Sequence, residues 1–127
     1  MLKETIDIAT PDLLLLTMVG SVQMLNGSVC RVCSASAASV RVATVKALNR
    51  MRIKVASIGK EDGNDRILAV SGERNIEVEV EQLGHRSTRM RISARQGEDN
   101  DILTAAEVIV HTEQLLSTSA PEHRQAP

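Results

Sequence analysis

Two stretches of alternating apolar and polar residues, joined by a short polar segment, give the strongest pattern in the chain. Residues 76–82 read Ile-Glu-Val-Glu-Val-Glu-Gln, and residues 88–95 read Thr-Arg-Met-Arg-Ile-Ser-Ala-Arg. Alternation with a period of two is typical of a β-strand with one buried face. If the connection turns at His85, Glu79 lies opposite Arg91, and the same register collects the apolar side chains on one face. Charge and packing therefore predict the same β-hairpin.

A second hairpin and a helix are predicted closer to the N-terminus. Residues 21–25 and 28–32 flank the dipeptide Asn26-Gly27, which favours a tight hairpin turn because both turn positions need a positive φ. Residues 34–51 then place apolar side chains at helical spacing, with Ser34 or Ser36 as the N-cap. The pattern thus predicts a hairpin followed by an amphipathic helix.

Two more strands and a last helix complete the pattern. Residues 53–59 and 66–72 predict strands that are joined by a polar loop over residues 60–65. After the alternating hairpin, Asp99 or Asn100 is expected to cap a last helix whose apolar side chains cover the sheet.

This order of elements predicts an α+β fold. We expect a two-layer sandwich, in which an antiparallel sheet (an N-terminal β-hairpin plus a four-stranded meander) carries amphipathic helices on one face. Residues 1–19 are expected to form an N-terminal apolar helical segment, and residues 20–116 a single α+β domain. Residues 117–127 are Ser, Pro and polar residues for the most part, which predicts a disordered tail.

The N-terminal segment contains an apolar run that must bury its side chains somewhere. The run is far shorter than the roughly 20 residues that a helix needs to cross a bilayer. The acidic residues before it and the lack of a convincing cleavage site do not fit a signal peptide. We therefore expect no membrane span, favour a cytoplasmic location, and take the run as a candidate interface, formed by Leu13, Leu14, Leu15, Leu16, Met18 and Val19.

Two residues of the predicted meander join this candidate interface. If Leu68 and Val70 point inward, Ile58 and Ile67 lie on the face that should be polar. Because an exposed apolar patch usually marks an interface, Ile58 and Ile67 become candidate interface residues. The alternative is that the N-terminal helix simply packs over the chain's own sheet.

Composition narrows the classes of partner. The 127 residues include 15 Lys and Arg against 16 Asp and Glu, a formal net charge of −1. Even the arginines of the predicted hairpin face glutamates, as Arg89 faces Glu81. Nucleic acid and acidic membrane surfaces are therefore not expected as partners. The chain has no Phe, Tyr or Trp, so it offers no aromatic platform for bases, and its core must consist of aliphatic side chains and methionine.

Cys30-Arg-Val-Cys33 has the spacing of a zinc-binding or redox pair, but its context fits neither. No second cysteine pair or close histidine pair supplies the remaining ligands of a zinc site. A redox pair sits at a helix start, whereas this one falls on a predicted strand, where residues three apart point to opposite faces. We expect both cysteines to be small buried hydrophobes, without metal and without a mutual disulfide.

The three histidines do not form part of a catalytic set. His85 falls in the hairpin turn, His111 in the last helix and His123 in the tail, and no nucleophile or carboxylate can be placed beside any of them. We therefore expect no enzyme, with no catalytic residue, no cofactor and no metal.

Four short motifs carry a resemblance to a known family. They are the hairpin Met24-Leu-Asn-Gly-Ser28, the helix Ala43-Thr-Val-Lys-Ala-Leu48, the strand Thr88-Arg-Met-Arg-Ile92, and Gly97-Glu-Asp99 before the last helix. In order and spacing they resemble the small bacterial family of unknown function catalogued under the number 3568. Members usually look like exported lipoproteins with a cysteine soon after the leader, which implies the cell envelope, but residues 13–20 contain no cysteine. The family has no established activity, so the resemblance implies a fold and no catalytic residue.

Together these observations favour a non-enzymatic interaction or structural module. It would assemble with itself, as a symmetric dimer, or with another protein, through the N-terminal apolar segment and the sheet surface. The alternative is a small apolar-ligand carrier, in which the helices and a curved sheet enclose a cavity lined by aliphatic residues and methionine.

Overall fold

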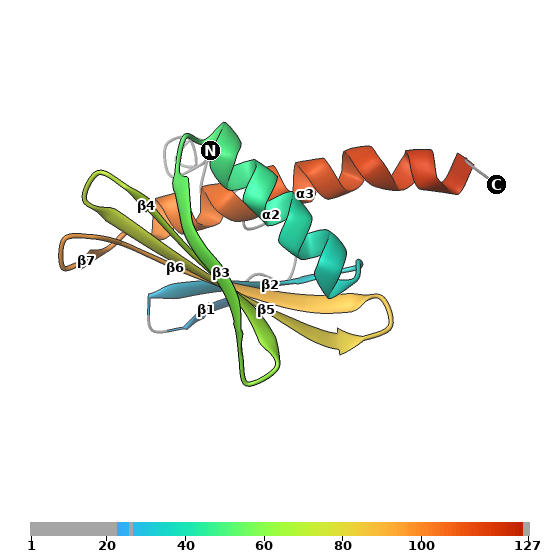
Figure 1. The fold of residues 1–127 in the computed structure, drawn as a ribbon, viewed down its shortest axis with the longest axis horizontal. Helices are drawn as coiled ribbons and strands as arrows, with labels where there is room; N and C mark the ends of the chain where they lie inside the picture. Colours follow the sequence, from blue (N-terminus) through green and yellow to red (C-terminus); the bar gives the residue numbers. More distant parts are fainter. Residues whose placement is uncertain (1–22, 26, 126–127) are drawn as a thin grey trace, which may run out of the picture.

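The protein is an α+β structure with one antiparallel sheet, as the sequence predicts. The computed structural model describes residues 23–25 and 27–125 (Figure 1). The sheet runs in the order β1-β2-β6-β5-β4-β3, and β7 pairs with the end of β6. The elements are β1 (Gln23–Leu25), β2 (Ser28–Cys33), α2 (Ala37–Arg50), β3 (Lys54–Glu61), β4 (Asn64–Ser71), β5 (Arg74–Gly84), β6 (Ser87–Gln96), β7 (Asp99–Asn100) and α3 (Ile102–Gln125).

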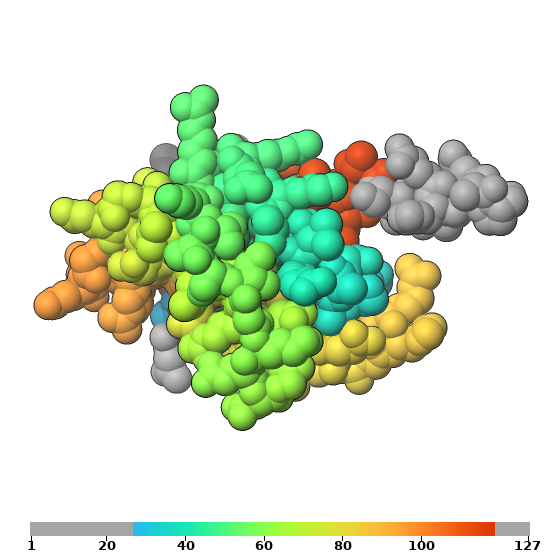
Figure 2. All heavy atoms as spheres, viewed as in Figure 1, coloured from blue at the N-terminus to red at the C-terminus, as the bar shows by residue number. Residues whose placement is uncertain are grey.

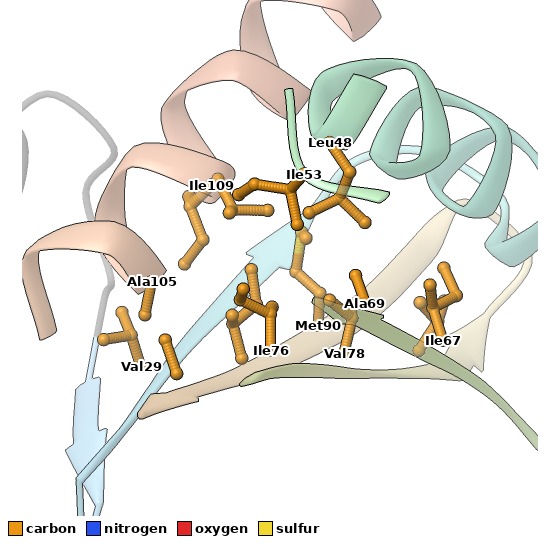
Figure 3. Close-up of a cluster of buried hydrophobic side chains, with 14 of the residues drawn as sticks. Val29, Leu48, Ile53, Ile67, Ala69, Ile76, Val78, Met90, Ala105 and Ile109 are labelled. Carbon is orange, nitrogen blue, oxygen red and sulfur yellow. The ribbon is translucent and has the colours of Figure 1, made fainter. Parts of the chain in front are cut away.

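Helices α2 and α3 cover the same face of the sheet, and the core lies between the two layers (Figure 1). The buried hydrophobic side chains are aliphatic, alanine, cysteine or methionine, as a chain without aromatic residues requires. Figure 3 shows this cluster, in which Leu48 and Ile109 from the helices meet Val78 and Met90 from the sheet. The opposite face, which we call the open face, carries the alternating polar side chains of β5 and β6.

The β5–β6 hairpin has the predicted register. Glu79 pairs with Arg91 across the two strands, and the alternate residues Val78 and Ile92 are completely buried. The prediction that charge and packing select one register is therefore confirmed, because a shift by one residue would exchange the two faces.

The first two hairpins close through tight turns. In the β1–β2 turn, Gly27 has a φ of 83°, a backbone conformation that favours glycine, and a Cβ at this position would also displace the Asn100 side chain, 2.6 Å away. The β3–β4 turn is shorter than the predicted loop over residues 60–65. Only Asp62 and Gly63 form it, with φ of 55° and 84°, because this pair adopts the left-handed turn that matches strand twist.

A side chain caps the N-terminus of α2 and of α3. Ser36 caps α2 as predicted, since its Oγ accepts a hydrogen bond from the Ser39 N–H at 3.2 Å. The cap of α3 is Asp101, whose Oδ1 accepts from the Thr104 N–H at 3.1 Å. The predicted caps Asp99 and Asn100 form β7 instead.

Helix α3 enters the C-terminal segment that the sequence analysis assigns to a tail. The backbone of α3 continues beyond Ser117 to Gln125, and in Figure 1 this last part of the helix projects away from the sheet. In the part of the chain that the structure describes, neither helix is long and apolar enough to cross a membrane.

Candidate interaction surface

The candidate interface residues do not lie together in the structure. The N-terminal run from Leu13 to Val19 falls outside the described residues. Ile58 is 49% exposed on β3, but Ile67 is fully buried in the core, so its assignment to an exposed interface is wrong. The β4–β5 register explains this, because it places Ile67 beside Val78 on the face covered by the helices.

The residues of β4 that point into the core are therefore the opposite set from the one considered from sequence. Ile67 and Ala69 point into the core, and Leu68 and Val70 lie on the open face with exposed fractions of 41% and 38%. All four are apolar, so alternation along β4 does not separate an inner face from an outer one. The neighbouring strand β5, whose alternation is unambiguous, decides the orientation.

Strand β3 is the long free edge of the sheet. It pairs only with β4 among the described strands and ends the strand order, whereas the strand at the other end, β1, has three residues. Seven of its eight residues are exposed, and Figure 2 shows this segment in green at the surface that faces the viewer. An exposed edge presents unpaired N–H and C=O groups to any additional strand.

Two features shape the β3 edge. A β-bulge between Val55 and Ser57 makes Ala56 an extra residue relative to β4. At the far end, Lys60 Nζ lies 3.0 Å from Asp65 Oδ1, and Arg66 pairs with Glu61. The exposed Ile58 lies between the bulge and these ion pairs.

The open face is charged and largely matched within the chain. Arg89 Nη2 lies 2.8 Å from Glu81 Oε1, and the hydrogen bond and charge of Glu81 raise the pKa of Arg89. Arg66 contacts Glu77. A hollow on this face has charged walls, lined by Glu79, Glu81, Arg89 and Arg91. Its polar character differs from the apolar cavity that a carrier of apolar ligands requires.

A second charged contact lies on the helix side of the sheet. Arg31 lies opposite Met90, so it points toward α3, and its Nε is 3.0 Å from Glu113 Oε2. The Nε–H is not directed at that oxygen and has no hydrogen-bond acceptor, so the contact is an ion pair. The Cys33 thiol donates to the same Glu113 oxygen at 3.3 Å. We call Arg31, Cys33 and Glu113 the Arg31 cluster.

The two cysteines behave as buried residues on different faces. Cys30 lies opposite Arg91 on the open face, whereas Cys33 lies opposite the buried Thr88, which confirms that their side chains point in opposite directions. Both are buried and carry free thiols. Burial first, and then the nearby Glu113 carboxylate, raise the pKa of Cys33 to about 12. A thiol of this kind is a poor nucleophile at neutral pH, because little thiolate is present.

The histidines remain apart. His85 is exposed in the β5–β6 turn and His111 lies half-buried on α3, while the side chain of His123 lies outside those that the structure describes. Among the described residues, no group of three or more His, Cys, Asp or Glu side chains could hold a metal ion.

Sequence reasoning missed the Arg31 cluster, although one signal points to it. Val29, Arg31 and Cys33 share one face of β2, so a strand that buries Val29 must also turn Arg31 inward. A charge in that position requires an acidic partner. The partner, Glu113, lies 82 residues further along the chain, and nothing in the local pattern singles it out.

No protein-family model matches the chain, and no curated protein is significantly similar to it. The resemblance to the bacterial family of unknown function therefore stays a prediction.

Proposed function

We propose that this protein is a non-enzymatic interaction module that assembles with a second copy of itself. The observation that carries the proposal is the free β3 edge, an eight-residue strand with a half-exposed isoleucine, Ile58, at its middle. Free edges in natural proteins are usually short, covered, bulged or charged. The β3 edge has a bulge and carries Lys54 and Lys60, but it is eight residues long, is not covered by the described elements, and exposes Ile58 between these features.

The remaining surface supports the same proposal. On the open face, arginines pair with glutamates of the same chain. This face therefore carries no unmatched stripe of positive charge that would attract nucleic acid. The N-terminal run from Leu13 to Val19 would add apolar area, with each buried side chain worth roughly 1.5 to 3 kcal/mol. Self-association gives both features a role, because a symmetric dimer uses the same surface twice.

The mass of the full chain in solution tests this function. Light scattering coupled to size exclusion, at loading concentrations from low to high micromolar, should show a species of twice the 13.8 kDa chain mass. Detection must use refractive index or peptide-bond absorbance, because the chain has no Phe, Tyr or Trp. A mass that stays at 13.8 kDa at every concentration would rule out self-association.

A truncated chain that lacks residues 1–19 tests the contribution of the N-terminal segment. If the segment serves association, the truncated chain should be a folded monomer, with the circular dichroism spectrum of an α+β protein. If the segment belongs to the monomer's own core, the same truncation should unfold the chain or leave it aggregating, because a large apolar surface would then be exposed.

A further inference from the structure

We infer that the second copy pairs along β3 in antiparallel orientation, with a two-fold axis at Ile58, so that one sheet continues across the dimer. The inference rests on the proposed self-association and specifies its surface and register. The partner is a second copy of this chain, and the argument comes from side-chain faces, exposure and charge along the edge.

The faces of the strand limit the registers that symmetry allows. Residues opposite each other in an antiparallel pair share a face of the sheet. A two-fold axis perpendicular to the sheet keeps each residue on the same face in both copies. The axis must therefore pass through a residue, which then lies opposite its own copy. An axis between two residues would place sequence neighbours opposite each other, and their side chains point to different faces.

Ile58 is the residue at the axis that best satisfies packing. It lies opposite Ile67 on the helix side of the sheet but is 49% exposed. At the axis it meets the Ile58 of the second copy, so each apolar side chain is covered by the other. On the open face, Ser57 of one copy then lies opposite Gly59 of the other, and these small residues allow close approach of the two strands.

The bulge brings the ends of the two strands into the same register. If the second copy passes over Ala56 as β4 does, Val55 comes opposite Lys60 of the second copy, and both share the helix side of the sheet. The aliphatic stem of Lys60 can cover the half-buried Val55. One step further, Lys54 comes opposite Glu61, both on the open face.

Charge favours this antiparallel pairing over the parallel one. The edge begins with the exposed bases Arg52 and Lys54, and its other end carries Lys60 with the exposed acids Glu61 and Asp62, which leaves one net negative charge there. Antiparallel pairing joins the basic end of one copy to the acidic end of the other, twice by symmetry. A parallel pairing in register would oppose like charges at both ends. The edge is thus complementary to itself in one orientation.

Substitution of Ile58 in the full-length chain tests the inference. Ile58→Lys places two ammonium groups opposite each other at the axis, and the solution mass should fall from twice the chain mass to 13.8 kDa. Val42→Lys is the matched control, because Val42 on α2 has the same exposed fraction, 49%. The control should keep the mass of the wild-type protein. Circular dichroism establishes that both variants are folded.

A charge exchange tests the register itself. Lys54→Glu should weaken association at least several-fold, because each glutamate would then face Glu61 of the other copy. Adding Glu61→Lys to the same chain exchanges the two charges and should restore association. Without that restoration, the pairing of Lys54 with Glu61 is wrong.

Cross-linking gives a positive signal that does not depend on a disruptive variant. Directly opposed residues have Cα atoms about 4.5–5.5 Å apart, which suits a disulfide. Ile58→Cys should therefore form a covalent dimer on mild oxidation, and Val42→Cys should not.

The outcomes separate this inference from the proposed function. A dimer that persists in Ile58→Lys and fails to cross-link through Ile58→Cys overturns the β3 pairing and leaves self-association through another surface. A wild-type chain that is monomeric at every concentration overturns both. Loss of the dimer only on removal of residues 1–19 assigns the contact to the N-terminal segment, against the β3 edge.

Discussion

Replacing Glu113 with glutamine removes the charge that compensates Arg31 beneath α3 while keeping the size of the side chain. The Arg31 and Glu113 side chains are 19% and 25% exposed, so the pair lies between a surface contact and a fully buried one. Exposed pairs contribute about 0–1 kcal/mol, and breaking a buried pair costs about 3–5 kcal/mol. For this intermediate burial we expect Glu113→Gln to lower the free energy of unfolding by about 1–2 kcal/mol.

A double variant distinguishes the value of the ion pair from the cost of an unpaired charge. Arg31→Met with Glu113→Leu replaces both partners by apolar side chains of similar length. Such replacements are often neutral or stabilising, because two charges no longer have to be taken out of water. We expect the double variant to be at least as stable as Glu113→Gln.

The measurement is urea unfolding followed by far-UV circular dichroism, since a chain without aromatic residues has no intrinsic fluorescence. Glu107→Gln is the matched control, because Glu107 is exposed on the same helix and its replacement should change stability by less than about 0.5 kcal/mol. If Glu113→Gln costs no more than this control, the Arg31 contact does not stabilise the fold and the reasoning fails.

Three further predictions concern the core, the open face and the buried thiol. Ile67→Ala should lower the free energy of unfolding by about 2–5 kcal/mol in the same assay, and a cost near zero would contradict its complete burial. Reversing the charge of Glu79 or of Arg91 alone should cost about 0.5 kcal/mol or less, with the double reversal recovering most of it in a double-mutant cycle; the absence of any recovery would show that the two side chains do not interact. The pKa of Cys33 is raised from 9.0 to about 12 in the fold, so between these values the unfolded chain loses a proton that the folded chain keeps. Stability should therefore fall as pH rises above 9, by at most about 1.4 kcal/mol per pH unit from this group, and Cys33→Ala should show a shallower decline between pH 8 and 11.

The sequence predicts the parts of the fold in which two independent signals agree. In the β5–β6 hairpin, alternation and opposed charges select the same register, and the structure has Glu79 opposite Arg91. The N-cap Ser36 is predictable for a similar reason, because a side-chain acceptor precedes a run of helical spacing. Local chemistry is sufficient in both cases.

The prediction fails where the residues of a strand do not alternate between apolar and polar. Strand β4 is apolar at four successive positions from Ile67 to Val70, so its inner face depends on pairing with β5 and not on its own pattern. The caps of α3 fail for a different reason. Asp99, Asn100 and Asp101 are all good capping residues, and only the pairing of the first two with β6 leaves Asp101 to cap the helix.

The candidate surface is predictable only in part. Strand spacing places Ile58 on the same face as Ile67, and the structure shows that this is the helix side of the sheet and not the polar face. The exposure of Ile58 comes from its position on a free edge, which depends on the strand order. That order follows from the connection through α2, which crosses the sheet and starts β3 at the edge away from β2. The Arg31 cluster joins residues on β2 and α3, and tertiary packing alone brings them together.

The pairing of β2 with β6 also has a consequence for how the chain folds. Cys30 pairs with Arg91 across about sixty residues of sequence, whereas each hairpin from β3 to β6 closes through a few residues. Contacts between distant residues form slowly, because a long loop must be ordered before they contribute. During synthesis, the first hairpin leaves the ribosome well before β6 exists. Strand β2, with Val29 and Cys33, therefore remains unpaired until β6 has been synthesised. The rate of synthesis sets how long this apolar strand can contact other chains.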